Sequence, residues 1–236
     1  MDEFKQAQKS YDQQALCYAE QANANRNLLN IRKLVYELLT PLTNKKILSI
    51  GCGDGTECVS FAENGAKVVG IDSSNELISL AKNKYSELGI DFLVMDYAES
   101  SFKNKTFDGI ISILSIMYKE NLTKVLMELK RILKQDGAMI IVVPHPVRKM
   151  IKYANFDYFA SGLHYETWED VTRYNYYRTL EEYFRLIKAS GLNIANLLEP
   201  KPQLDKPYQV INNVSEHLYP HSLVFVLQPS TLREGT

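Results

Sequence analysis

The stretch Ile47-Leu48-Ser49-Ile50-Gly51-Cys52-Gly53-Asp54-Gly55-Thr56, with Val68-Val69-Gly70-Ile71-Asp72 after it, decides the fold of this chain. Each piece starts with an apolar run typical of a buried strand. The first run stops at a glycine-rich turn and the second ends on an acid. The acid lies about 20 residues beyond the turn, which is the order in which α/β proteins build a seat for an adenosine-containing ligand.

Length and composition fit one large α/β domain. The chain has 236 residues, is 45% hydrophobic and carries a net charge of −1. This near balance disfavours a nucleic-acid partner, because binding to a phosphate backbone needs a basic face. The cysteines form no CxxC pair, so we expect neither a disulfide framework nor a metal site. We find no secretory leader and no apolar run long enough to span a membrane, so we expect a cytoplasmic protein without a membrane partner.

Strand and helix signals alternate from residue 46 onwards. Apolar runs predict strands at 47–50, 67–71, 92–95, 107–114 and 138–143, and helical patterns lie between them at 57–64, 75–88 and 122–133. This alternation of five strands with helical segments predicts a parallel sheet with right-handed crossovers. A helix over 179–190, with Thr179 as its N-cap, precedes two last strands at 192–198 and 222–227.

We interpret residues 1–236 as a single domain with four parts. They are an N-terminal helical arm (1–40), a ligand-binding core (45–146), an insertion (147–178) and the C-terminal part of the sheet (179–228). The insertion breaks the alternation and is rich in aromatic residues. The segment 199–221 contains several prolines, so we expect a long loop there.

The spacing of the glycine turn narrows the ligand. The dinucleotide fingerprint requires glycine at position 56, where this chain has Thr56, and no phosphate-loop sequence is present. A ligand without a pyrophosphate therefore fits better, and a nicotinamide-dependent oxidoreductase is the alternative. Asp72 can hold ribose hydroxyls or cap the following helix. Asp96, after the third strand, can receive an adenine amino group or serve only as a turn residue.

The chain resembles the class I S-adenosylmethionine-dependent methyltransferases of the small-molecule type. The resemblance runs from about residue 10 to 228 and rests on these motifs: Leu48–Gly55, Gly70–Ser74, Val94–Asp96, Phe107–Ser112 and Leu129–Gly137. It implies a Rossmann-like α/β fold with a seven-stranded, mostly parallel sheet, helices on both faces and an antiparallel last strand. It also implies S-adenosyl-L-methionine as the cofactor, with S-adenosyl-L-homocysteine as the product.

The same resemblance implies a set of cofactor contacts. The glycine turn would face the methionine part, Asp72 the ribose and Ser73 the adenine. Asp96 and Tyr97 would read the adenine edge. The set is completed by residues after the fourth strand and by residues of the arm that closes over the cofactor: Tyr11, Tyr18, Arg26, Gly51, Cys52, Gly53, Asp72, Ser73, Asp96, Tyr97, Ile113 and Leu114. Plain packing on one helix face is the alternative for the two tyrosines of the arm.

Methyl transfer depends on holding the acceptor in line with the donor more than on acid–base chemistry. The candidate catalytic residues are therefore few: His145, after the fifth strand, and Tyr118, after the fourth. A structural histidine is the alternative for His145. Aromatic rings with polar tips suit the recognition of a small molecule, so we predict substrate contacts in the insertion from among Tyr153, Phe156, Tyr158, His164, Tyr165, Trp168, Tyr174 and Tyr176. The insertion could instead pack on itself or on another subunit.

The leading hypothesis is an enzyme that transfers a methyl group to oxygen or nitrogen of a small organic molecule. The alternatives are the oxidoreductase and a non-catalytic, cofactor-binding partner subunit. We expect a monomer or a homodimer.

Overall fold

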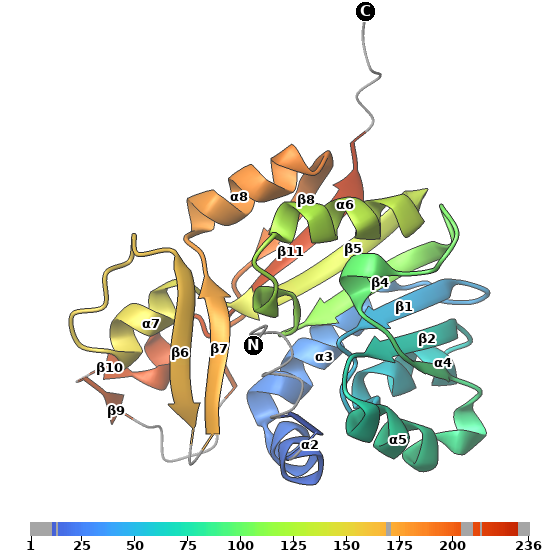
Figure 1. Ribbon diagram of the computed structural model, residues 1–236, viewed down its shortest axis with the longest axis horizontal. Coiled ribbons are helices and arrows are strands. Elements are labelled where there is room, and N and C mark those ends of the chain that lie inside the picture. Colours follow the sequence, from blue (N-terminus) through green and yellow to red (C-terminus); the bar gives the residue numbers. More distant parts are fainter. Residues whose placement is uncertain (1–10, 13, 169–170, 204–209, 213, 231–236) are drawn as a thin grey trace, which may run out of the picture.

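The computed structural model describes residues 11–12, 14–168, 171–203, 210–212 and 214–230. Its centre is a seven-stranded sheet with the strand order β3-β2-β1-β4-β5-β11-β8 (Figure 1). Five neighbouring strands are parallel, while β11 is antiparallel to both β5 and β8. The strands are β1 (Lys46–Ile50), β2 (Lys67–Asp72), β3 (Asp91–Val94), β4 (Phe107–Ile113), β5 (Leu133–Pro144), β8 (Leu192–Leu198) and β11 (Ser222–Pro229). The predicted Rossmann-like fold with an antiparallel last strand is confirmed.

Helices cover both faces of this sheet, and each face has its own apolar core. One core includes residues of α6 (Leu122–Ile132) and α8 (Leu180–Ala189). The other includes residues of α3 (Arg26–Leu39), α4 (Val59–Glu63) and α5 (Asn75–Lys84). Strand β4 is buried along almost its whole length, as expected for a strand covered from both sides.

Local sequence explains where the helices begin. Asn121 accepts a hydrogen bond from the backbone N–H of Lys124 at the start of α6. Thr179 does the same for the N–H of Glu182 at the start of α8, as predicted. These side chains satisfy N–H groups that have no partner within their helix.

Two predicted helices are shorter in the structure. The predicted helix 57–64 begins with the 3-10 turn η1 (Thr56–Cys58) before α4. The predicted helix 75–88 ends at Lys84 and is followed by the 3-10 turn η2 (Ser86–Leu88). Further 3-10 turns are η3 (Tyr97–Glu99) after β3, η4 (Ile116–Tyr118) after β4 and η5 (Glu216–Leu218) before β11.

The N-terminal arm and the insertion lie outside the sheet. The arm contains α2 (Ala15–Ala24), which leads into α3. The insertion contains α7 (Val147–Lys152) and an antiparallel hairpin of β6 (Gly162–Trp168) and β7 (Val171–Tyr177), drawn at the left in Figure 1. The segment predicted as a long loop also contains a short strand pair, β9 (Val210–Ile211) and β10 (Val214–Ser215).

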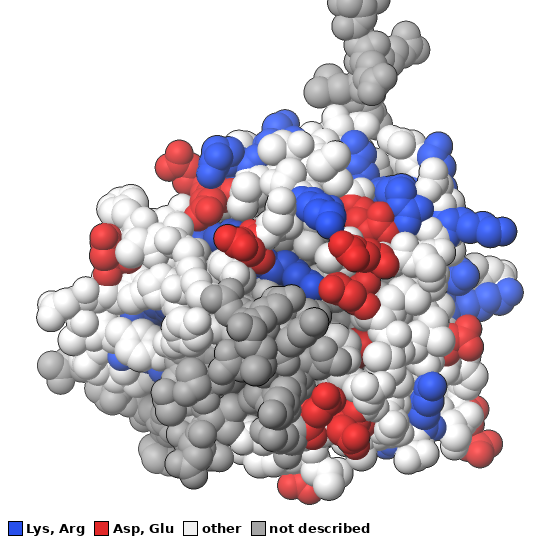
Figure 2. All heavy atoms as spheres, viewed as in Figure 1, with Lys and Arg blue, Asp and Glu red and all other residues white. Residues whose placement is uncertain are grey.

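Acidic and basic side chains are interspersed on the face shown in Figure 2. This mixture agrees with the near-zero net charge of the chain. Among the helices described here, none combines the length and the apolar character needed to cross a membrane.

Candidate active site

The glycine turn lies at the carboxyl end of β1 and is fixed against the loop after β4. Gly51 has a φ of 61°, in the region that favours glycine. A Cβ atom at this position would collide with the side chain of Ser115. The Ser115 hydroxyl donates a hydrogen bond to the carbonyl oxygen of Ile50 over 2.9 Å. The turn is therefore tightly packed on its inner side, which requires glycine at its first position.

Asp72, at the end of β2, is bonded directly to this turn. One carboxylate oxygen accepts the N–H of Gly53 over 2.9 Å, and the other accepts the N–H of Ser74, also over 2.9 Å. The N-cap of α5 is Ser74, whose hydroxyl accepts the N–H of Leu77. The alternative interpretation, in which Asp72 itself is the N-cap of α5, is therefore wrong. The carboxylate of Asp72 keeps acceptor capacity for the hydroxyls of a ribose.

Burial raises the pKa of Asp72, and the backbone N–H groups that bind its carboxylate oppose this shift. The negative charge of Asp12 also raises the pKa of Asp72. Burial away from water raises the pKa of a carboxyl group, and hydrogen bonds from backbone N–H groups to the carboxylate lower it.

Asp96, at the end of the neighbouring strand β3, already has two partners. One oxygen accepts the N–H of Ala98, and the other lies 2.6 Å from the ammonium nitrogen of Lys119. Tyr97 is 6% exposed, and its hydroxyl donates to the carbonyl oxygen of Ser115. Since this ring lies in the core, only the backbone of Tyr97 is left to meet an adenine ring. The two predicted adenine contacts stay predictions.

The arm lies across the carboxyl ends of β2 and β4. The hydroxyl of Tyr11 is within hydrogen-bonding distance of the hydroxyl of Tyr118, which follows β4. A carboxylate oxygen of Asp12 accepts a hydrogen bond from the hydroxyl of Ser74, which follows β2. These contacts agree with an arm that covers the edge of the sheet where the glycine turn lies.

Tyr18 and Arg26 are the other predicted contacts of the arm. The side chain of Tyr18 lies outside the described residues. Arg26 is exposed at the start of α3. Their contacts with the methionine part of the cofactor stay predictions.

A polar network behind the turn was missed by the sequence analysis. Asp54 accepts hydrogen bonds of 2.9 Å from Asn23, Thr56 and Lys84. Burial alone would raise the pKa of Asp54, but these donors together lower it. Asn23 lies in α2, so the network also connects the arm to the glycine turn.

Glu57 is the second buried acid near the turn. It is 8% exposed, and its carboxyl group accepts a hydrogen bond from the hydroxyl of Ser49 in β1. Burial raises the pKa of Glu57 to about 7, although the Ser49 hydroxyl and the charge of Arg32 oppose the shift. This carboxyl group therefore changes its charge near neutral pH.

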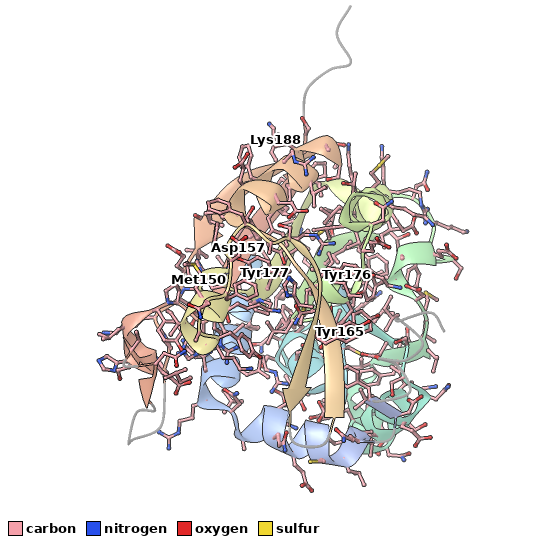
Figure 3. All side chains as sticks on the ribbon, turned by 60° about the vertical axis from the view of Figure 1, so that its left-hand side comes forward. Met150, Asp157, Tyr165, Tyr176, Tyr177 and Lys188 are labelled. Carbon is pink, nitrogen blue, oxygen red and sulfur yellow. The ribbon has the colours of Figure 1, made fainter. Side chains whose placement is uncertain are left out.

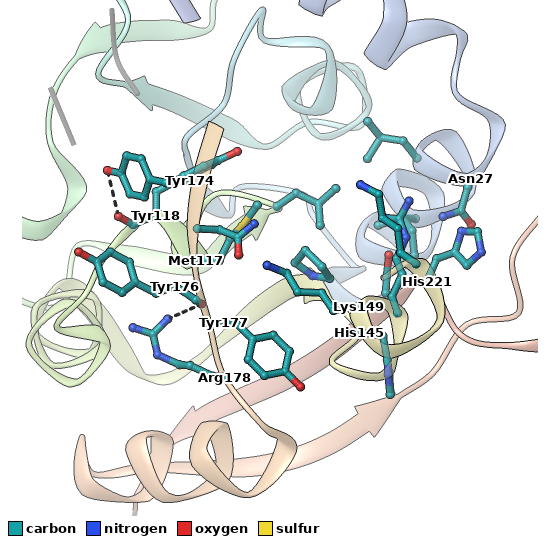
Figure 4. Close-up of a pocket in the computed structure, with 18 of the residues that line it drawn as sticks. Asn27, Met117, Tyr118, His145, Lys149, Tyr174, Tyr176, Tyr177, Arg178 and His221 are labelled. Carbon is teal, nitrogen blue, oxygen red and sulfur yellow. Dashed lines mark hydrogen bonds between the residues drawn. The ribbon is translucent and has the colours of Figure 1, made fainter. Parts of the chain in front are cut away.

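A cavity of about 540 Å³ opens beside the ends of β4 and β5 (Figure 4). Figure 4 shows Tyr118, Tyr174 and Tyr176 gathered on one side of the cavity and Lys149, His145 and His221 on the other. The arm and α3 complete the wall. The lining includes Tyr11, Leu28, Ile31, Leu114, Met117, Tyr118, His145, Arg148, Lys149, Lys152, Tyr174, Tyr176, Tyr177, Arg178, Glu216 and His221.

Two of the predicted substrate-contact residues, Tyr174 and Tyr176, line this cavity. The structure brings other predicted residues together elsewhere, around Tyr177 of the hairpin. The rings of Phe156 and His164 lie 4.9 Å and 5.6 Å from the ring of Tyr177. The Tyr177 hydroxyl donates to the carbonyl oxygen of Tyr158. This half of the insertion therefore packs on itself, which was the alternative interpretation.

Three predicted substrate contacts remain. Tyr153 and Tyr165 are not among the cavity-lining residues, and Tyr165 is 59% exposed on the hairpin (Figure 3). The side chain of Trp168 lies outside the described residues. The sequence pattern does not distinguish these three residues from Tyr174 and Tyr176, which line the cavity. The position of each ring depends on how the hairpin folds back over α7.

His145 and Tyr118, the two catalytic candidates, both line the cavity. The Nδ1 atom of His145 accepts the N–H of Val147 over 3.2 Å, and its Nε2 atom lies 2.7 Å from a carboxylate oxygen of Glu199. Because Nδ1 accepts a bond, the neutral ring has its N–H group at Nε2, which donates a hydrogen bond to Glu199. Neither ring nitrogen then has a free lone pair for a substrate proton. This geometry favours the structural interpretation of His145. Tyr118 keeps its hydroxyl in the cavity, paired with that of Tyr11.

Several cavity residues were not predicted from the sequence. The clearest are Arg148, Lys149 and Lys152 on α7, and Tyr177 and Arg178 at the end of β7. The density of basic residues in 148–152, directly after the fifth strand, was the signal available in the sequence. It was masked by the near-zero charge of the whole chain.

Comparison with known proteins identifies the family. Residues 48–141 match the family model described as a methyltransferase domain, and this range contains the glycine turn, Asp72 and Asp96. Residues 48–141 therefore form a methyltransferase domain, in agreement with the resemblance to the class I S-adenosylmethionine-dependent methyltransferases. This match supports S-adenosylmethionine as the cofactor, as predicted, and it disfavours the nicotinamide alternative.

Curated relatives match this chain over part of their length. The chain is 34% identical to the ubiquinone biosynthesis O-methyltransferase of Pelagibacter ubique over 116 residues, which is 48% of each protein. It is 32% identical to the sterol 4-C-methyltransferase strm-1 of Caenorhabditis elegans over 111 residues, 45% of this chain and 33% of the relative. The chain therefore matches a third to a half of the length of these relatives.

Solved structures match over most of the chain. An S-adenosylmethionine-dependent methyltransferase from Mesorhizobium loti superimposes with a TM-score of 0.69 at 22% identity, covering 82% of this chain and 95% of the other. One from Clostridium acetobutylicum gives a TM-score of 0.67 at 16% identity, covering 91% and 99%. At these identities the likeness concerns the fold alone.

Proposed function

We propose that this methyltransferase transfers the methyl group of S-adenosylmethionine to an oxygen or nitrogen atom of a small organic molecule bound in the cavity beside β4 and β5. The observation that carries the proposal is the position of this cavity. Leu114 and Tyr11 line it, and both belong to the predicted cofactor contacts. An acceptor in the cavity would therefore lie next to the predicted position of the methyl group.

The residues of the predicted cofactor site fit the cofactor. Gly51 and Gly53 give the turn two residues with positive φ at a strand end, and Asp72 has acceptor capacity beside it. When bound, S-adenosylmethionine supplies a methyl group on a positively charged sulfur atom. An acceptor atom held in line by the cavity wall would take up this methyl group, with neutral S-adenosylhomocysteine as the other product, and any proton on that atom would be released to the solvent.

In this proposal the chain contributes mainly orientation and exclusion of water. The edge-to-face rings of Tyr11, Tyr118 and Tyr174, with centroids 5.9 and 6.0 Å apart, form a rigid wall. Holding an acceptor in line with the donor can supply much of the rate acceleration. The hydroxyl of Tyr118 is the candidate that would hydrogen-bond the acceptor, while the bonding of His145 favours a positioning role.

The names of the relatives do not indicate which acceptor atom this chain methylates. Their names cover a sterol 4-C-methyltransferase, O-methyltransferases of ubiquinone biosynthesis and a phosphatidylethanolamine N-methyltransferase. The choice of oxygen or nitrogen rests on the sequence and on the polar groups in the cavity wall. The expected monomer or homodimer, the cytoplasmic location and the absence of nucleic-acid and membrane partners stay predictions.

The proposal is tested with the purified chain, labelled S-adenosylmethionine and a panel of small phenols, carboxylic acids and amines. We expect label in at least one acceptor and matching formation of S-adenosylhomocysteine. The Tyr118→Phe variant should lose turnover while it binds S-adenosylhomocysteine normally. Binding of neither the donor nor its product by well-folded protein would contradict the proposal.

A further inference from the structure

The acceptor cavity carries an excess of positive charge. Its described lining contains four basic side chains, Arg148, Lys149, Lys152 and Arg178, and one acidic side chain, Glu216. The whole chain, by contrast, has nearly equal numbers of basic and acidic residues. The charge of the cavity is therefore a local feature of its wall.

Three of the four basic residues come from the single short helix α7. Lys149 is 9% exposed, and its ammonium nitrogen lies 5.8 Å and 5.7 Å from the ring centres of Phe156 and Tyr177. Arg148 and Lys152 are exposed at the same helix. A charge held among aromatic rings interacts more strongly with an opposite charge than one in open water does.

Arg178, the fourth basic residue, fixes the wall in place. Its guanidinium group donates to the carbonyl oxygens of Tyr176, Lys119 and Glu120 over 3.2, 2.8 and 2.6 Å. These bonds attach β7 to the loop after β4. Arg178 thus positions the tyrosines of the hairpin, and the helix α7 is left as the part of the wall suited to recognise a charged ligand.

The described groups that face α7 include two histidines and one carboxylate. His221, at the start of β11, has its pKa lowered by burial and by the charge of Arg148, and its Nε2 atom donates to the carbonyl oxygen of Glu216 over 3.0 Å. His145 is engaged by Glu199 on its other side. Within the described lining, Glu216 is the one carboxylate against the cations of α7.

We propose that the methyl acceptor of this enzyme is an organic anion. Its carboxylate or phosphate group faces Arg148, Lys149 and Lys152, and its apolar or aromatic body lies against Met117, Tyr174 and Tyr176. Taking an anion out of water is costly unless a cation meets it, and α7 supplies that cation inside an otherwise aromatic wall. This inference rests on the proposed function and specifies the substrate class of the same site.

The test uses matched pairs of small aromatic acids and their neutral amides, starting with 4-hydroxybenzoate and 4-hydroxybenzamide, with phenyl phosphate as the phosphate probe. Binding is measured by calorimetry on the full chain saturated with S-adenosylhomocysteine. We expect the acids to bind roughly 10- to 100-fold more tightly than their amides, the range for hydrogen bonds to a charged group. The tighter of the carboxylate and phosphate probes identifies the anionic group.

Two variants and one control connect the preference to α7. Lys149→Met and Arg148→Met should each remove most of the preference for the acid, and Arg148 is exposed, so its replacement leaves the core intact. The control is Lys188→Met, on the exposed side of α8, which should keep the preference for the acid (Figure 3).

Amides that bind as tightly as acids, acids that do not bind at all across the panel, or an acid preference that survives both α7 variants would each overturn the inference. Binding of S-adenosylhomocysteine is measured on the same samples. Its loss would count against the proposed function, whereas normal product binding without an acid preference would count against the anionic acceptor alone.

Discussion

Asp72 connects the two strand ends that form the predicted cofactor site. It receives backbone N–H groups from the glycine turn and from the start of α5. This arrangement keeps the carboxylate in one orientation before any ligand arrives, and such preorganisation reduces the cost of binding.

Replacement of Asp72 by Asn should weaken the binding of S-adenosylhomocysteine by about 1–3 kcal/mol, because the charged acceptor for the ribose is lost. Calorimetry measures the change. Asp91→Asn is the matched control, since Asp91 is exposed at the opposite end of β3. Unchanged affinity in Asp72→Asn would remove this residue from the cofactor site.

Glu57 should make the stability of the fold depend on pH. Its pKa is raised from 4.5 to about 7 by burial, so the folded state holds a proton that the unfolded state releases. The resulting stabilisation is complete below about pH 4.5 and is lost as the pH rises through about 7, and it amounts to at most about 3 kcal/mol.

Urea unfolding of the wild type and Glu57→Gln at pH 5 and pH 8 tests this effect. The neutral amide keeps the acceptor for the Ser49 hydroxyl and removes the titration. We therefore expect the free energy of unfolding of the variant, relative to that of the wild type, to be higher at pH 8 than at pH 5. An equal stability difference at both pH values would show that Glu57 keeps an ordinary pKa.

At the scale of elements, the arm should be needed for turnover rather than for folding. The buried residues described in its first part are Ala15 and Ala19, whose burial contributes little to the core. By contrast, Tyr11 reaches Tyr118 in the cavity, and Asp12 reaches Ser74 beside Asp72.

Deletion of residues 1–20 should therefore abolish the formation of S-adenosylhomocysteine while circular dichroism still shows a cooperative thermal transition. The Tyr11→Phe variant of the full chain serves as the milder control, because it removes one hydroxyl and keeps the arm. Full turnover by the truncated protein would contradict the covering role of the arm.

The elements also show what sequence patterns reveal and what they miss. The strands β1, β2, β3, β4 and β8 were predicted to within one residue at each end. For β1, β2 and β4 the reason is that buried parallel strands leave strong local signals. Strand β5 begins five residues earlier than predicted, at Leu133, where its pairing with β4 contains an irregularity. Such an extension is decided by the neighbouring strand and has no local signal.

In the insertion, tertiary contacts decide which aromatic side chains reach the cavity. The aromatic composition of this segment predicted a cover over the substrate, but composition does not say which face of a hairpin a ring occupies. Tyr174 and Tyr176 line the cavity, whereas Phe156 and His164 pack behind Tyr177. In the same way, the bond of His145 to Glu199 joins residues that are 54 positions apart, and no sequence motif brings them together.

At the scale of the whole molecule, thermal stabilisation by S-adenosylhomocysteine or by NAD distinguishes a methyltransferase from a nicotinamide-dependent oxidoreductase. A ligand that binds only the folded state stabilises it by about 2.7 kcal/mol at 100 times its dissociation constant. For a domain of this size that corresponds to a rise in Tm of roughly 5–10 °C. We expect this rise with S-adenosylhomocysteine and none with NAD, because Thr56 replaces the glycine that a dinucleotide requires. Differential scanning fluorimetry of the wild type and Asp72→Asn measures it, and the variant should need a higher concentration of S-adenosylhomocysteine for the same rise. Stabilisation by NAD alone would mean that the turn after β1 holds a pyrophosphate, and the proposed methyl transfer would then have to be abandoned.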